Sequence, residues 1–344
     1  MTDDFETALR YFKALGDETR IRLLNILDSR EFNVRELMEI LEMGQSRISR
    51  HLKVLQDAAL VEVRRDGLWA FYRAVNRGPG RRFANSIRYL FDGATGFQRD
   101  LQRCDGLLKN GRLQSTRFFD SVASGWEAMK RSVIGELDLV GEIACRIPQA
   151  ENAADLGCGS GAMIQRIQGR VRRVIGVDSS REMLAETGKR LVRGTAEVDL
   201  RIGELEHLPI RDAETEVAII NLVLHHLRNP GVGLQEAQRI LRPGGTLIVA
   251  DFCKHEKELM RDRYGDHWLG FSSAQMEQWL ESAGIRVVER ICFPVRMGLQ
   301  VFVYSCRKPR GRQVCGSTTG NKYTGFQERN ILFKESKHNE HEGA

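Results

Sequence analysis

The chain has 344 residues, enough for two domains that each bury a hydrophobic core. Its formal net charge of +6 permits a nucleic-acid partner without requiring one. No uncharged apolar run approaches the roughly 20 residues that cross a bilayer, so we expect no membrane partner. Seven cysteines without regular spacing, in a chain that lacks a signal-like start, predict reduced thiols and a cytoplasmic location.

The first 80 residues change from a helical pattern to a strand pattern. Apolar residues recur at helical spacing in four segments, namely 5–15, 18–28, 34–41 and 45–58. Two short strand-like segments follow, and they join around Asp66-Gly67, a dipeptide suited to a tight hairpin turn. Helices followed by a basic hairpin predict an α+β winged helix-turn-helix domain over residues 1–80.

The fourth of these helices has the chemistry of a recognition helix. Arginine and lysine reach guanine edges or phosphates, glutamine reads adenine, and serine donates to phosphate. A charged helix face is usually only solvated, but residues 44–77 hold seven Lys/Arg against three Asp/Glu. The predicted DNA contacts are Gln45, Ser46, Arg47, Ser49, Arg50, His51 and Lys53 on the helix, with Arg64 and Arg65 on the hairpin.

This order of elements, with the run from Ala14 to Arg20 before the second helix, resembles the ArsR/SmtB family of bacterial repressors over residues 1–80. The resemblance implies double-stranded operator DNA as a partner. Many members sense thiophilic metals through a Cys-x-Cys pair, and the matching positions here are Asn33 and Arg35. Because the first cysteine of the chain is Cys104, we predict no metal site.

Residues 81–117 are basic and have apolar residues at helical spacing. In the repressor family a helix that follows the wing packs against its symmetry mate, which sets two recognition helices about one DNA turn apart. The resemblance therefore implies a homodimer, with 81–117 as a helical linker or dimerisation segment. A connecting helix without self-association is the alternative.

A glycine-rich run opens a second pattern. Three glycines stand at alternate positions in Asp155-Leu156-Gly157-Cys158-Gly159-Ser160-Gly161. Glycine there lets a strand turn sharply into a helix and lets the backbone approach a ligand. Asp178 follows the next predicted strand, where a carboxylate can accept hydrogen bonds from both ribose hydroxyls. The run predicts a nucleoside site, although a tight turn between buried elements also needs glycine.

Downstream lie the segments 203–210, 217–226 and 241–250. In this order and spacing they resemble the class I S-adenosylmethionine-dependent methyltransferases, over residues 118–307. The resemblance implies an α/β Rossmann-like domain that binds S-adenosylmethionine, or S-adenosylhomocysteine as an effector. In that family the glycine loop holds the methionine moiety, the acid after the second strand binds the ribose, and the pair Glu204-Leu205 contacts adenine. The ligand-binding residues so implied are Asp155, Gly157, Gly159, Gly161, Asp178, Ser179, Glu204, Leu205 and Asn221.

The sequence assigns no catalytic residue. His225 and His226 follow a predicted strand at the mouth expected for a substrate, where one can act as a general base. A loop histidine that packs beneath the cofactor is the favoured alternative. The aromatic run 264–271 either covers a substrate or packs a loop on the sheet. The polar, irregular residues 308–344 predict a disordered tail, to which no function is assigned.

A DNA reader joined to a methyl-donor domain predicts a transcriptional regulator in which ligand and operator binding are coupled. The fused arrangement resembles proteobacterial regulators that respond to S-adenosylhomocysteine and control methionine-cycle genes. The alternative is an active S-adenosylmethionine-dependent small-molecule methyltransferase with a DNA-tethering or autoregulatory domain, because a cofactor loop establishes only binding. A nucleic-acid methyltransferase is disfavoured, since the run 221–224 lacks the Pro-Pro-aromatic signature that holds a flipped base.

Overall fold

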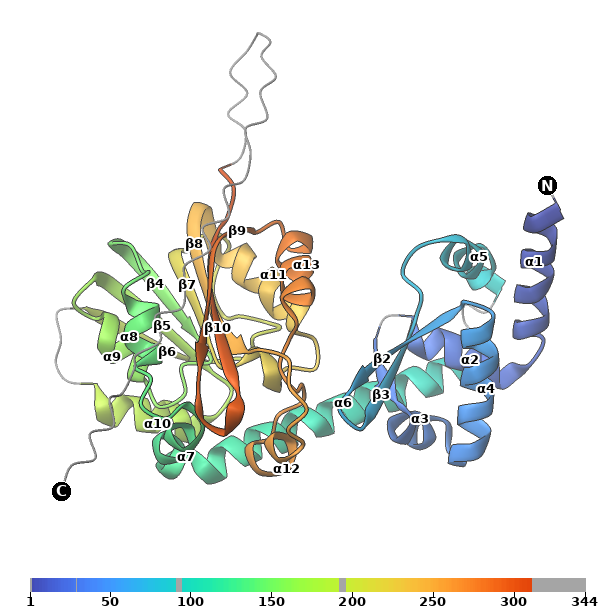
Figure 1. Ribbon diagram of the computed structural model, residues 1–344, viewed down its shortest axis with the longest axis horizontal. Coiled ribbons are helices and arrows are strands. Elements are labelled where there is room, and N and C mark those ends of the chain that lie inside the picture. The colour runs from blue at the N-terminus through green and yellow to red at the C-terminus, as the bar shows by residue number, and fades with distance from the viewer. Residues whose placement is uncertain (1, 29, 91–94, 192–195, 311–344) are drawn as a thin grey trace, which may run out of the picture. The chain divides into compact units, whose positions relative to one another are not determined.

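The computed structural model describes residues 2–28, 30–90, 95–191 and 196–310. Within them, a helical N-terminal domain with a small sheet precedes a C-terminal domain built on a large sheet (Figure 1). No helix in this part of the chain is long and apolar enough to cross a membrane. Apart from 308–310, the predicted tail lies outside the described residues.

Four helices and a three-stranded sheet form the N-terminal domain. Asp17 caps one helix by accepting from the Arg20 N–H at 3.0 Å, and Asn33 and Glu36 form a reciprocal capping box at the start of the next. Gly67 turns the hairpin with φ 59°. The elements are α1 (Thr2–Leu15), α2 (Glu18–Leu27), β1 (Phe32–Asn33), α3 (Val34–Leu41), α4 (Gln45–Asp57), β2 (Val61–Asp66) and β3 (Trp69–Ala74), with strand order β1-β3-β2. The predicted winged helix-turn-helix is confirmed.

Two helices follow the hairpin. Helix α5 (Pro79–Ile87) leads into a short 3-10 helix (Arg88–Leu90), and α6 (Thr95–Val122) extends for 28 residues. Helix α6 continues past residue 117, where the sequence predicted the end of the linker. It therefore belongs to both of the segments that the sequence had separated.

The C-terminal domain is a seven-stranded sheet with the order β6-β5-β4-β7-β8-β10-β9 (Figure 1). The first five strands in this order are parallel, and β10 is antiparallel to both of its neighbours. The strands are β4 (Ala150–Leu156), β5 (Val171–Asp178), β6 (Glu197–Ile202), β7 (Thr215–Asn221), β8 (Leu241–Phe252), β9 (Arg286–Pro294) and β10 (Gln300–Arg307). The predicted Rossmann-like fold is confirmed.

Helices cover both faces of this sheet. Consecutive strand residues point to opposite faces, and Ile219 and Ile220 of β7 are both fully buried, in two separate core clusters. Helices α8 and α9 pack on the first cluster, and α11 and α13 pack on the second. The helices are α7 (Trp126–Ile134), α8 (Leu139–Ala144), α9 (Ala162–Ile167), α10 (Arg181–Arg190), α11 (Pro230–Ile240), α12 (Leu259–Tyr264) and α13 (Ser273–Ser282), with 3-10 turns at Ala123–Gly125, Leu224–His226 and Arg296–Gly298.

The strand order reverses at β4. Strands β5 and β6 lie on one side of it, whereas β7 and β8 lie on the other. In open α/β sheets a ligand binds outside the carboxyl ends of the strands at such a reversal. Asp155, Asp178 and Asn221 stand at the carboxyl ends of β4, β5 and β7, so the fold brings three residues of the predicted site to one edge.

Candidate functional site

The glycine loop after β4 has a backbone that glycine accepts most easily. Gly157, Gly159 and Gly161 have φ angles of 76°, 51° and 81°. A Cβ on Gly157 would lie 2.6 Å from the Val223 side chain, and one on Gly161 would lie 2.7 Å from that of Thr187. Gly157 and Gly159 line a cavity of about 900 Å³, whereas Gly161 begins α9 outside its lining. The loop therefore forms a backbone cradle at the edge of the sheet.

Asp178 fastens the glycine loop to the end of β5. Its Oδ2 accepts from the Gly159 N–H at 2.8 Å, and its Oδ1 accepts from the Ser180 N–H at 2.9 Å. Burial raises the pKa of this carboxyl, and the backbone donors oppose the rise. Asp178 and Ser179 both line the cavity. Each carboxylate oxygen has further lone-pair capacity, so the acid can shape the loop and still accept from a ligand hydroxyl.

Two buried oxygens on the cavity wall fit a ligand that donates hydrogen bonds. Asp155 Oδ2 and Asn221 Oδ1 have no hydrogen-bond partner among the described residues. Unpaired buried acceptors are rare, and hydrogen-bond donors of a bound ligand would satisfy them. Leu205, beside Glu204, adds an apolar wall where the resemblance places adenine. When bound, S-adenosylmethionine supplies an electrophilic methyl group on sulfur.

Asp155 makes the stability of the ligand-free protein depend on pH. Burial raises the pKa of its carboxyl to about 7, against the opposing effect of Lys130 and with a further rise from Asp178. Between about pH 4 and 7 the folded chain holds a proton that the unfolded chain has released, so the free energy of unfolding falls by about 1.4 kcal/mol per pH unit. This contribution is complete below pH 4 and is lost as the pH rises through 7.

Asp155→Asn is expected to remove the fall in the free energy of unfolding with rising pH, because the substituted side chain does not titrate. The free energy of unfolding of the wild type minus that of the variant should therefore decrease as the pH rises. Urea denaturation at several pH values without ligand measures this difference, in which titrating groups that do not interact with Asp155 cancel. A difference that is constant from pH 4 to 8 would contradict the assignment.

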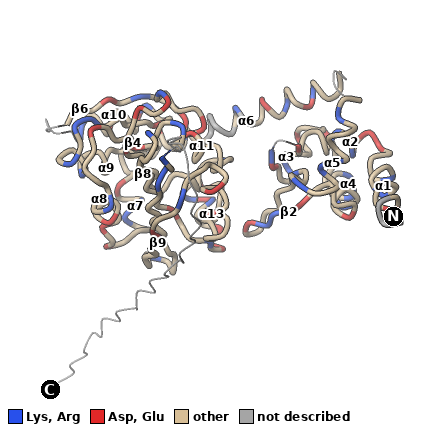
Figure 2. Tube along the Cα trace, turned by 90° about the horizontal axis from the view of Figure 1, so that it is seen from above, with Lys and Arg blue, Asp and Glu red and all other residues tan. Residues whose placement is uncertain are grey.

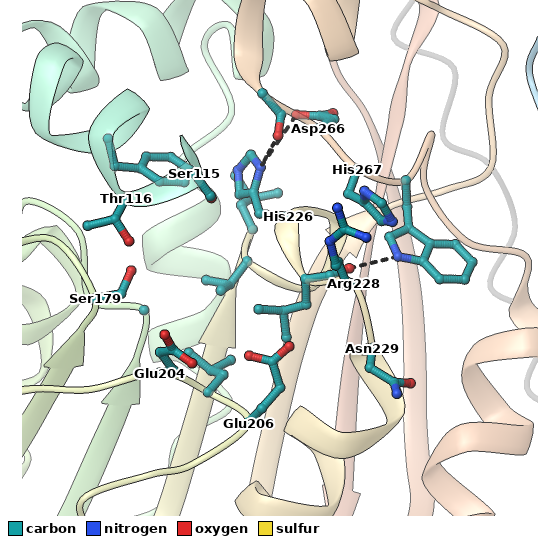
Figure 3. Close-up of a pocket in the computed structure, with 18 of the residues that line it drawn as sticks. Ser115, Thr116, Ser179, Glu204, Glu206, His226, Arg228, Asn229, Asp266 and His267 are labelled. Carbon is teal, nitrogen blue, oxygen red and sulfur yellow. Dashed lines mark hydrogen bonds and ion pairs between the residues drawn. The ribbon is translucent and has the colours of Figure 1, made fainter. Parts of the chain in front are cut away.

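Part of the cavity wall was not predicted from the sequence. Ser115 and Thr116 of α6, Glu206, and Arg228 also line it. Figure 3 shows Ser179, Glu204 and Glu206 on one side of the cavity and His226 with Asp266 on another. Glu206 lies within a motif that the resemblance matched, but α6 carries no motif and was predicted to be a linker.

The aromatic run after α12 is mostly interior. Trp268 is 4% exposed, packs on Phe271 and Trp279, and donates from Nε1 to the Leu227 carbonyl at 2.8 Å. This supports packing on the sheet as its role. His267 of the same run lines the cavity.

Helix α4, the predicted recognition helix, exposes most of the predicted DNA contacts. Gln45, Ser46, Arg47, Ser49, Arg50 and Lys53 are exposed, while Ile48, Leu52 and Leu55 are buried. Figure 2 marks the Lys and Arg positions along this helix and the hairpin. Arg47 and Arg50 make no ion pair with any residue that the structure describes, whereas Lys53 pairs with Asp57 at 2.6 Å. His51 is only partly exposed and lies 3.6 Å from Asp17, so it faces the start of α2.

The two arginines of the hairpin differ in their exposure to solvent. Arg65 is exposed. Arg64 is instead partly buried, pairs with Glu31 at 2.9 Å, and lies 3.6 Å from the ring centre of Trp268. Arg64 is thus held against a residue of the C-terminal domain, and its contact with DNA stays a prediction.

Asp66, at the hairpin turn, anchors a contact between the hairpin and the C-terminal domain. Its side chain is fully buried, pairs with Lys254, and accepts from Arg261 at 2.7 Å. Burial would raise the pKa of this carboxyl, but Lys254, Arg261 and Arg64 outweigh it and lower the pKa. The sequence identified Asp66 only as a turn residue.

These features define two classes of domain: a DNA-binding regulator at the N-terminus and an S-adenosylmethionine-dependent methyltransferase domain at the C-terminus. Residues 17–63 match the model for "Bacterial regulatory protein, arsR family", and residues 154–249 match the model for "Methyltransferase domain". The chain belongs to the arsR family of bacterial regulatory proteins and carries a methyltransferase domain in addition. A relative of Mycolicibacterium smegmatis that is 32% identical over 139 residues, covering 40% of this chain and 52% of that one, is a probable S-adenosylmethionine-dependent methyltransferase.

Relatives match one domain at a time. Over 75 residues the chain is 36% identical to an uncharacterized HTH-type transcriptional regulator of Methanocaldococcus jannaschii, covering 22% of this chain and 84% of that one. Over 106 residues it is 36% identical to the ubiquinone/menaquinone biosynthesis C-methyltransferase of Rubrivivax gelatinosus, covering 30% and 41%. A solved S-adenosylmethionine-dependent methyltransferase of Methanosarcina mazei is similar with a TM-score of 0.43 at 19% identity, over 51% of this chain and 100% of that one. The chain spans only 30% to 52% of the length of the first curated relatives it matches.

Proposed function

We propose that the protein is a transcriptional regulator whose methyltransferase domain binds S-adenosylmethionine or S-adenosylhomocysteine and couples that ligand to operator binding. The observation that carries the proposal is helix α6, which contacts the DNA-binding domain with its first half and the ligand site with its second. A ligand that changes the position of such a helix acts on both sites.

The first half of α6 is fastened to the helices that support α4. Arg22 of α2 forms a bidentate pair with Asp100, both bonds at 2.7 Å, and the Asp100 side chain is 1% exposed. Arg103 donates to the Ile40 carbonyl of α3 at 3.1 Å and pairs with Glu42 at 2.8 Å. Breaking a buried bidentate pair is costly, so this half is expected to move together with α2 and α3.

The second half of α6 reaches the ligand site. Asp120 accepts from the Ser180 hydroxyl at 2.6 Å, and Ser180 in turn donates its N–H to Asp178, the predicted ribose acid. Phe119 lines the cavity and packs edge-on against Trp126 and His226, with ring centres 5.5 and 4.8 Å away. Asp178 is therefore linked to the helix by two hydrogen bonds, both made by Ser180.

The β2–β3 hairpin provides a second physical connection between the DNA-binding domain and the ligand site. Asp66 at its turn is paired with Lys254 and Arg261, and Arg64 lies on Trp268. Lys254 follows β8, Arg261 lies in α12 and Trp268 follows α12, on the segment that also carries Asp266 of the cavity wall. Ligand-dependent displacement of that segment would change the support of the wing.

The coupling is tested by calorimetric titration of the full chain with S-adenosylmethionine and with S-adenosylhomocysteine, each with and without operator DNA. Because coupling is reciprocal, DNA is expected to change the affinity of at least one ligand by about 5- to 150-fold, or about 1–3 kcal/mol. A matched titration with Asp66→Asn should show a smaller change, since that variant weakens the hairpin contact.

Ligand affinities that are the same with and without DNA would overturn the proposal. They would favour the alternative, an active small-molecule methyltransferase with a separate DNA anchor. The cavity favours this second candidate in one respect, because it extends beyond the Asp178 and Glu204 end to His226 and Asp266. Methyl transfer from labelled donor to a metabolite extract would support it.

Exposed apolar residues on α1 support a homodimer. Phe5 and Leu9 are 72% and 41% exposed, and with Phe12 they follow the spacing of one helix face. The resemblance to repressors implies a homodimer through residues 81–117, and we propose in addition that this face of α1 packs against the second copy of the chain. Phe5→Asp with Leu9→Asp is expected to give a monomer in sedimentation velocity, whereas the control Leu68→Asp, at an exposed leucine of the hairpin, should leave a dimer. Equal sedimentation of wild type and double variant would exclude this face.

A further inference from the structure

A cluster of two histidines and two carboxylates lies beside the ligand cavity. His225 and His226 lie in the 3-10 turn after β7. Asp251 is the penultimate residue of β8, and Asp266 follows α12. We propose that His225, His226 and Asp266 bind a divalent transition-metal ion, with Asp251 orienting His225. The sequence had predicted no metal site, and the proposed regulation neither requires nor excludes one.

The distances suit a small tetrahedral ion. His225 Nε2 lies 3.6 Å from Asp266 Oδ1, and His226 Nδ1 lies 3.8 Å from the same oxygen. One ligand atom from each of the three side chains lies within 4.8 Å of the others. Zinc holds nitrogen and oxygen ligands at about 2.0–2.2 Å, which places neighbouring ligand atoms about 3.4 Å apart. Small side-chain rotations therefore complete the geometry.

Asp251 aligns the first histidine. Its Oδ1 lies 2.6 Å from His225 Nδ1, and both side chains are almost fully buried. A carboxylate on one ring nitrogen fixes the tautomer that leaves the other nitrogen free for a metal, an arrangement seen repeatedly in metal sites. The free nitrogen, Nε2, is the atom that faces Asp266.

Asp266 supplies the independent sign that something is bound there. Its side chain is 1% exposed, yet neither of its oxygens has a hydrogen-bond partner in the described part of the chain. A buried carboxylate without hydrogen bonds is costly unless a cation satisfies it. A proton on His225 would pair with Asp251 and one oxygen of Asp266, but it would leave the other oxygen of Asp266 unsatisfied. His226 Nδ1 lies 3.3 Å from the Gly265 carbonyl, a contact that metal binding through Nδ1 would replace.

The ligand set and its position indicate the kind of ion and its exposure. Two imidazoles and one carboxylate favour Zn²⁺ or a neighbouring transition metal over Mg²⁺ or Ca²⁺, which prefer oxygen. His226 and Asp266 line the cavity (Figure 3), so the remaining coordination position faces it. Three protein ligands with an open position leave room for water or for an oxygen or nitrogen atom of a bound molecule.

The test is equilibrium dialysis of metal-free full chain against Zn²⁺, with Co²⁺ as a spectroscopic probe of four-coordinate binding. We expect one ion per chain and visible cobalt absorption. His226→Ala and Asp266→Asn should each weaken binding at least a hundred-fold, and Asp251→Asn by about 10- to 100-fold as an orienting residue. His207→Ala, which removes an exposed histidine outside the cluster, is the matched control and should bind like the wild type. His338→Ala with His341→Ala excludes the tail.

Thermal melting and DNA binding of the metal-free variants, compared with those of the metal-free wild type, show that the variants are folded. Absence of one-to-one binding by the wild type would overturn the proposal. Wild-type affinity in both His226→Ala and Asp266→Asn would overturn it as well, because the ion would then be elsewhere. The DNA-dependent ligand titration is a separate experiment, so failure of the regulatory proposal is distinguishable from failure of this one.

Discussion

Replacing Arg47 and Arg50 together by alanine is expected to weaken specific DNA binding at least a hundred-fold and to leave S-adenosylhomocysteine affinity unchanged. Both residues are exposed on α4 and make no ion pair with a described residue, so their charge is available to DNA. A base-contacting arginine typically contributes about 1–3 kcal/mol, and each lost phosphate contact reduces the salt dependence by about one unit of slope. Fluorescence anisotropy at several salt concentrations measures both quantities.

A charge-matched control separates recognition from net charge. Arg172→Ala with Lys189→Ala removes two positive charges from exposed positions of the C-terminal domain. That variant should bind the operator nearly as the wild type does. If both double variants lose affinity equally, the protein's overall charge attracts DNA and α4 is not the recognition helix.

Asp178→Ala is expected to weaken S-adenosylhomocysteine binding by about 10- to 100-fold, or about 1.4–2.7 kcal/mol. Two losses contribute. The ligand loses an acceptor for its ribose hydroxyls, and the Gly159 N–H loses the carboxylate that holds the glycine cradle at 2.8 Å. Isothermal titration calorimetry of the full chain measures the change.

Glu182→Ala serves as the control, because it removes a carboxylate from an exposed position on α10 near the site. It should bind the ligand as the wild type does. Asp178→Asn helps to separate the loss of the ribose acceptor from the loss of the Gly159 contact, since the amide of the variant keeps one acceptor oxygen for the glycine loop. Unchanged affinity in Asp178→Ala would remove this acid from the site and with it the ribose assignment.

The sequence predicted the elements whose signals are local. Asn33 and Glu36 stand three residues apart and cap the same helix end, and the alternate glycines at 157 and 159 require no distant partner to adopt positive φ. Asp178 was predicted because it ends a strand of the expected pattern, and parallel strands bring their carboxyl ends to one edge. In each case the physical cause acts within a few residues or through a regular topology.

The features that the sequence did not predict depend on contacts between segments that are far apart in the chain. From the sequence alone, Asp66 is expected to be a solvent-exposed turn residue. In the structure it is covered by the segment that carries Lys254 and Arg261, which are 188 and 195 residues away along the chain. His225 meets Asp251 because β7 and β8 pair in one register, and Asp266 arrives from an irregular loop that no period describes. The boundary at 117 was placed where the methyltransferase resemblance begins, although α6 has no structural break there.

Helix α6 also fixes the angle about its axis between its contacts with the DNA-binding domain and its contacts with the ligand site. An α-helix turns about 100° and rises about 1.5 Å per residue. Inserting a single residue between Arg103 and Asp120 would swing one set of contacts about a third of a turn around the axis relative to the other. Seven inserted residues would restore the rotation while lengthening the helix by about 10.5 Å. The spacing between the two anchors is therefore a quantity that selection can hold fixed, independently of which residues fill it.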